Sequence, residues 1–163
     1  MKAVSEHQSR RAAVHEAGHV AAAVAFGIPI IAVTIADDRP HLHRARYRPQ
    51  CFSVGLRRLV TLCLSGAEAE RYFCGPIPDG ADTTDRRMAR EYLSRRFATY
   101  EIETQIAHCQ DTAARMARSP WGQWHITRIA DALLQHGSLS GDEVGNIVGQ
   151  GAARLQPIPE PGR

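Results

Sequence analysis

Residues 14–20 read VHEAGHV and contain a pair of histidines four residues apart, with a glutamate directly after the first. In an α-helix this spacing places His15 and His19 side by side on one face, where their ring nitrogens can bind one zinc ion. Glu16 then lies beside the metal without being forced to bind it, which suits a general base that deprotonates a zinc-bound water. The segment therefore predicts a hydrolytic zinc site in which Glu16 is the catalytic residue.

An ordinary helix that carries this pattern by chance is the competing interpretation, because the chain contains eight histidines. Gly18 favours the metal site, since a glycine inside a helix costs about 1 kcal/mol that a purely structural helix has no reason to bear. Glu16 favours it too, because a glutamate on a core-facing helix surface needs a partner, and a zinc ion is such a partner. We therefore favour metal binding.

A catalytic zinc site needs a third protein ligand and one open coordination position. Residue type alone leaves several candidates open, namely His41, His43, Glu68, Glu70, Asp82 and Asp85. His41 and His43 lie among arginines, and an exposed basic hairpin is the commoner explanation for such a segment. Asp85 could equally cap the free amides of a helix, and Glu70 could be a solvated helix residue.

The elements that must position these residues are mainly helical. A helix is expected over residues 7–26, with Ser5 as its N-cap and Gly27 and Pro29 as its stop, followed by a strand over residues 30–36. A polar loop or hairpin covers residues 37–50. Further helices are expected over residues 56–75, over 85–117 as one long or two shorter helices, over 124–137, and after a Ser140-x-x-Glu143 capping box. The expected core includes Trp124, Ile126, Ile129, Leu133 and Leu134.

Composition indicates one folded domain over residues 1–155, followed by a Pro-rich tail over residues 156–163. Hydrophobic residues make up 44% and charged residues 23% of the chain, which is ordinary for a globular protein. The net charge of +3 is too small to argue nucleic-acid binding. We expect no membrane span, because Gly27 and Pro29 interrupt the most apolar run, and no signal peptide. The four cysteines form no C-x-x-C pair, so we expect reduced thiols in a cytoplasmic protein.

Four segments of the chain are recognisable together. They read AVHEAGHVAAAVAFGIPIIAVTI, LSGAEAERYFCG, GADTTDRRMAREYL and ADALLQHGSLSGDEV, and they resemble, in the same order, the peptidase domain of the FtsH-type ATP-dependent zinc proteases. The resemblance covers about residues 9–148, and ordered motifs are much more specific than a single one. It implies a mainly α, zincin-like metallopeptidase domain with a small β-element beside the helix that carries HEAGH.

Roles for individual residues follow from this resemblance. The zinc-binding histidines and the catalytic glutamate of the family correspond to His15, His19 and Glu16. The third zinc ligand of the family is an aspartate at the start of a helix, which corresponds to Asp85. The turn before it is one residue longer here, so Asp82 is the reserve candidate.

The segment LSGAEAER combines a likeness to the family with a departure from it. Glu70 corresponds to a family glutamate that supports the metal site without binding the metal. The family segment is closer to LGGRAAEE, and this difference affects the expected substrate contacts more than zinc binding. The chain also contains no G-x-x-x-x-G-K-[ST] motif, so we expect no ATP-driven unfolding by this polypeptide.

The leading hypothesis is a stand-alone zinc metalloendopeptidase that cleaves peptides or unfolded protein, with the substrate laid along an edge strand near residues 31–35. A separate ATPase or adaptor partner and a homo-oligomer are left open. The alternative is a catalytically silent zinc-binding adaptor or regulatory domain, and the intact Glu16 weighs against it. A third hypothesis, nucleic-acid binding through the arginines of residues 39–48, predicts binding that persists at physiological salt, which we do not expect.

Overall fold

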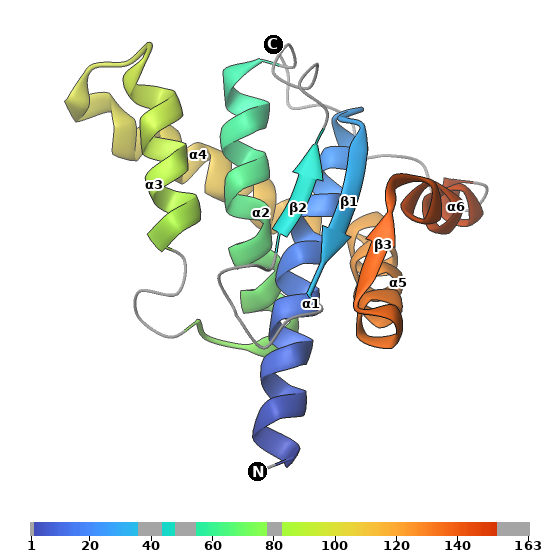
Figure 1. Ribbon diagram of the computed structural model, residues 1–163. Coiled ribbons are helices and arrows are strands. Elements are labelled where there is room, and N and C mark those ends of the chain that lie inside the picture. Colours follow the sequence, from blue (N-terminus) through green and yellow to red (C-terminus); the bar gives the residue numbers. More distant parts are fainter. Residues whose placement is uncertain (1, 36–43, 48–54, 78–82, 153–163) are drawn as a thin grey trace.

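A computed structural model describes residues 2–35, 44–47, 55–77 and 83–152 of the chain (Figure 1). The described residues form a mainly helical structure with a small antiparallel sheet, as the sequence predicts. The elements in chain order are α1 (Lys2–Ala25), β1 (Ile30–Thr34), β2 (Arg44–Tyr47), α2 (Leu56–Cys74), α3 (Thr83–Ser94), α4 (Thr99–Arg118), α5 (Pro120–His136), β3 (Ser138–Ser140) and α6 (Gly141–Ala152).

Helix α1 runs through the middle of the structure, with α2 on one side and α5 on another, and the sheet lies against it (Figure 1). Its buried surface is made of small side chains such as Ala13 and Ala17, which pack with Ile126 and Ile129 of α5. The helix ends at Ala25, two residues before the predicted stop at Gly27, whose φ of 68° is readily adopted only by glycine. It begins at Lys2, so the prediction that Ser5 caps it is wrong.

The sheet has the strand order β2-β1-β3, and both pairings are antiparallel. Val33 of β1 lies opposite Ala45 of β2 and opposite Leu139 of β3, and both Val33 and Leu139 are buried against the helices. The expected edge strand at residues 31–35 is therefore wrong. β1 is the central strand, and from Ala32 to Thr34 it pairs with β2 on one side and with β3 on the other, so this segment offers no free edge to a substrate.

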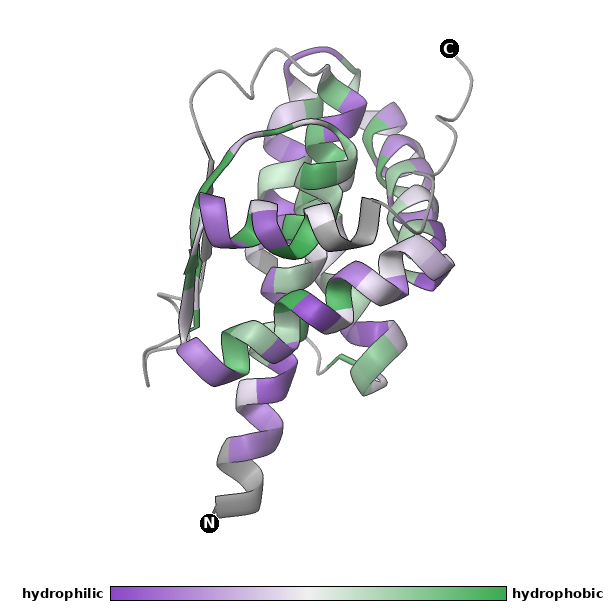
Figure 2. Cartoon of the chain, turned by 90° about the vertical axis from the view of Figure 1, so that its right-hand side faces the viewer, coloured by the Kyte–Doolittle hydropathy of each residue, from purple (hydrophilic) through white to green (hydrophobic). Residues whose placement is uncertain are grey.

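A second hydrophobic cluster joins α2, α3 and α4. The predicted helical segment 85–117 is divided into α3 and α4, which pack through Leu93 and Ile106, both fully buried, on Val60 and Leu64 of α2. Figure 2 shows hydrophobic residues gathered where the helices meet, whereas the N-terminal part of α1 is hydrophilic and extends beyond them. The cluster fixes the start of α3 relative to α1 and α2.

The C-terminal elements follow the predicted signals except at the start of α5, which begins at Pro120 and not at the predicted residue 124. α5 ends at Gly137, which has a φ of 74°, and the backbone N–H of Ser140 donates to Glu143 Oε2 at 2.7 Å in the predicted capping box of α6. Ile126, Ile129 and Leu133 are buried as predicted, whereas Trp124 is only half-buried and Leu134 is 40% exposed, so the prediction for Leu134 is wrong. Among the described helices, none is both long and apolar enough to cross a membrane. The tail, residues 156–163, lies outside the described residues.

Candidate metal centre

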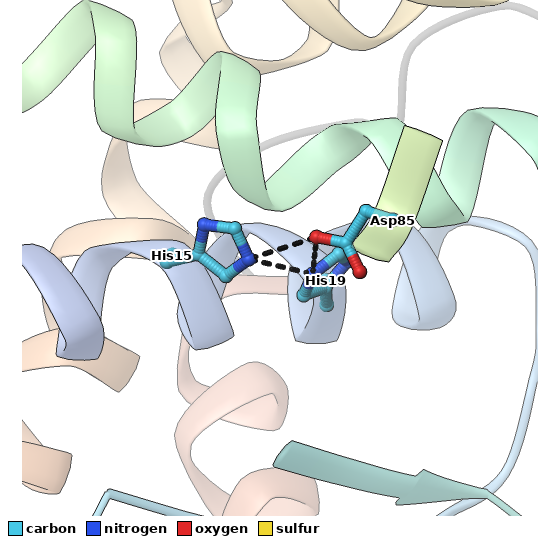
Figure 3. Close-up of side chains that lie close together, drawn as sticks. All are labelled: His15, His19 and Asp85. Carbon is cyan, nitrogen blue, oxygen red and sulfur yellow. Dashed lines mark hydrogen bonds and ion pairs between the residues drawn. The ribbon is translucent and has the colours of Figure 1, made fainter. Parts of the chain in front are cut away.

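His15, His19 and Asp85 lie together where α1, α2 and α3 meet, and one ligand atom of each falls within 4.8 Å of the others. His15 Nε2 is 3.0 Å and His19 Nε2 is 3.3 Å from Asp85 Oδ2, and the two Nε2 atoms are 3.1 Å apart. Figure 3 shows the imidazoles of α1 and the carboxylate of α3 converging on one point. The structure thus brings together the residues that the sequence predicts as metal ligands.

Asp85 reaches the histidines because of the pattern of α3. Asp85, Ala89 and Leu93 recur every four residues and therefore share one face of the helix. Ala89 and Leu93 are fully buried against α2 and α4, so they anchor this face. Asp85, in the first turn of α3, is then directed toward α1.

Two glycines allow α1 and α2 to approach closely at this point. A Cβ atom on Gly66 would lie 2.5 Å from His19 Nε2 and 2.7 Å from His15 Nε2. A Cβ atom on Gly18 would lie 2.5 Å from Ser65 O. The imidazoles therefore lie against the bare backbone of α2. The sequence points to Gly18 but not to Gly66, whose only signal is its place among small residues in LSGAE.

Each histidine is oriented through Nδ1. His19 Nδ1 donates to the main-chain oxygen of Leu62 at 2.8 Å, and His15 Nδ1 donates to Glu70 Oε2 at 3.2 Å. Both contacts place a proton on Nδ1, so Nε2 is the nitrogen of each ring that would bind a metal, as in metal-binding histidines. Glu70 thus contacts His15 without belonging to the cluster of three, and its supporting role in a metal site stays a prediction. Its ion pair with Arg11 was not predicted from the sequence.

The charges of the cluster stabilise one another. Burial by itself would lower the pKa of His15, but hydrogen bonds to Asp85 and Glu70 and their negative charges raise it to about 10. Burial would raise the pKa of Asp85, but hydrogen bonds and charges from both histidines hold it well below its usual range. Burial opposes ionisation of Glu70 as well, and contacts with His15 and Arg11 lower its pKa. The cluster thus holds cationic and anionic groups in close contact.

Glu16 is the exception in this balanced cluster. The residue is only 5% exposed, and its Oε2 atom is buried without a hydrogen-bond partner in the described part of the chain. An unpaired carboxylate oxygen in the protein interior is costly unless a cation or a hydrogen-bond donor compensates it. Two imidazoles, a carboxylate and this uncompensated oxygen therefore fit a divalent zinc ion, for which two histidines and an acidic ligand form a common catalytic set.

The remaining ligand candidates are not brought to the centre by the described structure. Glu68 is buried, but its Oε1 accepts hydrogen bonds from Gln110 Nε2 at 2.7 Å and from Arg71. His41, His43 and Asp82 lie outside the described residues. Asp85 is therefore the third ligand that the described residues provide.

Comparison with known proteins does not place the chain in a family. No protein-family model matches it, and no curated protein matches it.

Proposed function

We propose that this chain is a zinc-dependent metalloendopeptidase, related to the peptidase domain of the FtsH-type proteases, that hydrolyses peptides or unfolded protein. The observation that carries the proposal is the buried, unpartnered Oε2 of Glu16, a residue whose charge acts on His15 in the cluster of His15, His19 and Asp85. A metal site retained only for structure has no need of such a carboxylate, because closed structural zinc sites are completed by their ligands.

In this proposal His15, His19 and Asp85 would hold a zinc ion, which would supply Lewis acidity for the hydrolysis. Glu16 Oε2 accepts a proton from the attacking water, since no hydrogen bond from another described residue occupies it. The same carboxyl group then donates the proton to the departing amine nitrogen. Burial of Glu16 excludes bulk water, so the proton stays between this oxygen and the substrate.

Substrates in this proposal are loosely folded chains, or chains delivered by a separate ATPase or adaptor. Within the described residues, Cys63, Cys74 and Cys109 are free thiols, which suits the proposed cytoplasmic location.

The test combines metal analysis with cleavage assays. Purified wild type is expected to contain one zinc per chain and to cleave casein and a quenched peptide. Glu16→Gln is expected to retain zinc and to lose about 10²- to 10⁴-fold in activity, the usual contribution of a general base. Glu6→Gln is the matched control, because Glu6 is an exposed glutamate of the same helix.

Other outcomes assign the chain differently. Zinc without cleavage in the wild type would indicate the silent adaptor instead. Absence of zinc after refolding with the metal would disprove the metal centre itself.

A further inference from the structure

The two carboxylate oxygens of Glu70 contact different residues. Its Oε2 atom accepts from His15 Nδ1 at 3.2 Å. Its Oε1 atom is held by Arg11, with Nε at 2.7 Å and Nη2 at 2.6 Å. Arg11 and His15 are one helical turn apart on α1, so arginine, glutamate and histidine form a continuous chain of contacts that ends at the candidate metal centre.

We propose that Arg11 is a positioning residue of the metal centre, which fixes Glu70 and thereby the direction of His15 Nε2. This inference rests on the proposed function, because it concerns how the metal ligand is aimed. Within the described residues, the hydrogen bonds and ion pairs of Arg11 go to Glu70, Cys74 and Pro76 and not to the three clustered residues or to Glu16. The effect of Arg11 on His15 is proposed to pass through the carboxylate of Glu70.

The guanidinium group is itself fixed at several points. Besides Glu70, it donates through Nη1 to Cys74 O at 3.2 Å and through Nη2 to Pro76 O at 2.9 Å. These carbonyl groups lie at the end of α2 and just beyond it, four and six residues after Glu70. The planar group therefore cannot rotate without losing contacts to the backbone, and it holds Glu70 Oε1 in one place.

Burial makes this support necessary. The side chain of Glu70 is only 11% exposed and that of Arg11 only 17%. A carboxylate at this depth is costly without a cation, so removal of Arg11 favours a Glu70 rotamer that reaches water and releases His15. His19 is protected from such a change, because its acceptor is the main-chain oxygen of Leu62. Of the two histidines, His15 is thus the one whose Nδ1 is held by a side chain, Glu70, which a mutation can change.

A purely structural role for Arg11 predicts a different result. If Arg11 only tied the end of α2 to α1, its loss would weaken metal binding equally whether or not Glu70 carried a charge. If it acts through Glu70, its loss has no further effect once Glu70 can no longer hold His15. A double-mutant cycle therefore separates the two roles.

The experiment measures zinc affinity by chelator competition and the visible absorption of the cobalt-loaded protein. The variants are Arg11→Ala, Glu70→Gln and the double variant, and Arg10→Ala is the matched control, because Arg10 is an exposed neighbour on the same helix. We expect Arg11→Ala to lower zinc affinity by about 10- to 100-fold and to change the cobalt spectrum. The double variant is expected to bind zinc no more weakly than the weaker-binding of the two single variants, Arg11→Ala and Glu70→Gln. Arg10→Ala is expected to match the wild type.

Arg11→Lys keeps the experiment decisive if Arg11→Ala does not fold. A lysine retains the charge beside Glu70, although it cannot bind both carbonyl groups as well, so we expect a cobalt spectrum like that of the wild type and intermediate zinc affinity. Unchanged affinity in Arg11→Ala, or equal losses with and without Glu70, would overturn the role of Arg11 alone. A wild type that binds neither zinc nor cobalt would overturn the metal centre and this inference together.

Discussion

Two histidines in different regions of the molecule, one largely buried and one completely buried, show how surroundings decide the role of a side chain. His15 contacts two carboxylates, and they raise its pKa to about 10 although burial acts in the opposite direction. His125 of α5 is completely buried, stacks on Trp121 with ring centroids 4.1 Å apart, and donates through Nδ1 to Trp121 O at 2.8 Å. Burial lowers the pKa of His125, and hydrogen bonds to the backbone only partly oppose this.

The comparison separates burial from chemistry. The side chain of His15 is 19% exposed, that of His125 is fully buried, and both rings have Nδ1 fixed by a hydrogen bond. Only His15 faces a second histidine and acidic oxygens, so only His15 lies where a cation would be stabilised. A buried histidine is therefore a ligand candidate when its second nitrogen meets other donors, and a core residue when it meets aromatic rings.

The largest effect on zinc affinity is expected at Gly66, where the two imidazoles lie against the backbone of α2. Gly66→Ala places a methyl group within 2.7 Å of both Nε2 atoms, so the imidazoles and α2 must separate. We expect zinc affinity to fall by more than about 100-fold, beyond the loss from a single supporting residue, and stability to fall by about 1–3 kcal/mol. Zinc titration and urea unfolding measure both.

Gly145→Ala is the matched control for this substitution. Gly145 lies in α6, where a Cβ atom would meet nothing within 4 Å. We expect unchanged zinc affinity and a gain of about 0.5–1 kcal/mol in stability, because alanine is the better helix former. Wild-type zinc affinity in Gly66→Ala would show that the close approach of α2 does not shape the centre.

The next effect tests the comparison directly by making the same substitution in both regions. His15→Phe removes a proposed ligand and is expected to abolish zinc binding, since two protein ligands do not make a stable zinc site. His125→Phe keeps an aromatic ring beside Trp121, so we expect unchanged zinc affinity and a stability change below about 1.5 kcal/mol. Zinc titration decides the outcome, and equal losses in the two variants would refute the distinction between the regions.

The sequence predicts only the part of the difference between His15 and His125 that depends on the local spacing of residues. The interval of four residues in HEAGH identifies His15 and His19, because a helix turns about once in that interval. Asp85 could be singled out only through the family resemblance, since nothing local connects it to residues 70 positions earlier. Helix ends at Gly27 and Gly137 were equally predictable, because those backbone conformations favour glycine.

The rest depends on packing between distant segments, which no local pattern reports. Arg11 and Gly66 gain their roles only when α2 lies against α1, and the acceptor of His19 is a main-chain oxygen, so the identity of Leu62 carries no signal. The central position of β1 was missed because β3 has only three residues, too few to show an alternating pattern. Leu134 was assigned to the core from its type, although the exposed face of α5 contains it.

The smallest effect concerns the pH dependence of stability and sharpens the contrast between the two histidines. The pKa of folded His125 lies below the usual 6.5, so between these values the unfolded chain binds more protons than the folded protein. The contribution of neutral His125 to the free energy of unfolding is therefore complete above pH 6.5. It is lost as the pH falls through this window, with a slope of at most about 1.4 kcal/mol per pH unit.

Urea unfolding of the wild type and His125→Phe between about pH 7.5 and pH 5 isolates this contribution, because all other titrating groups are common to both proteins. The stability of the wild type relative to the variant is expected to decrease as the solution becomes more acidic. A relative stability that stays constant would mean that His125 keeps its ordinary pKa in the folded protein. The aromatic surroundings would then not disfavour the charged ring, and burial among apolar groups could no longer explain why this histidine differs from His15.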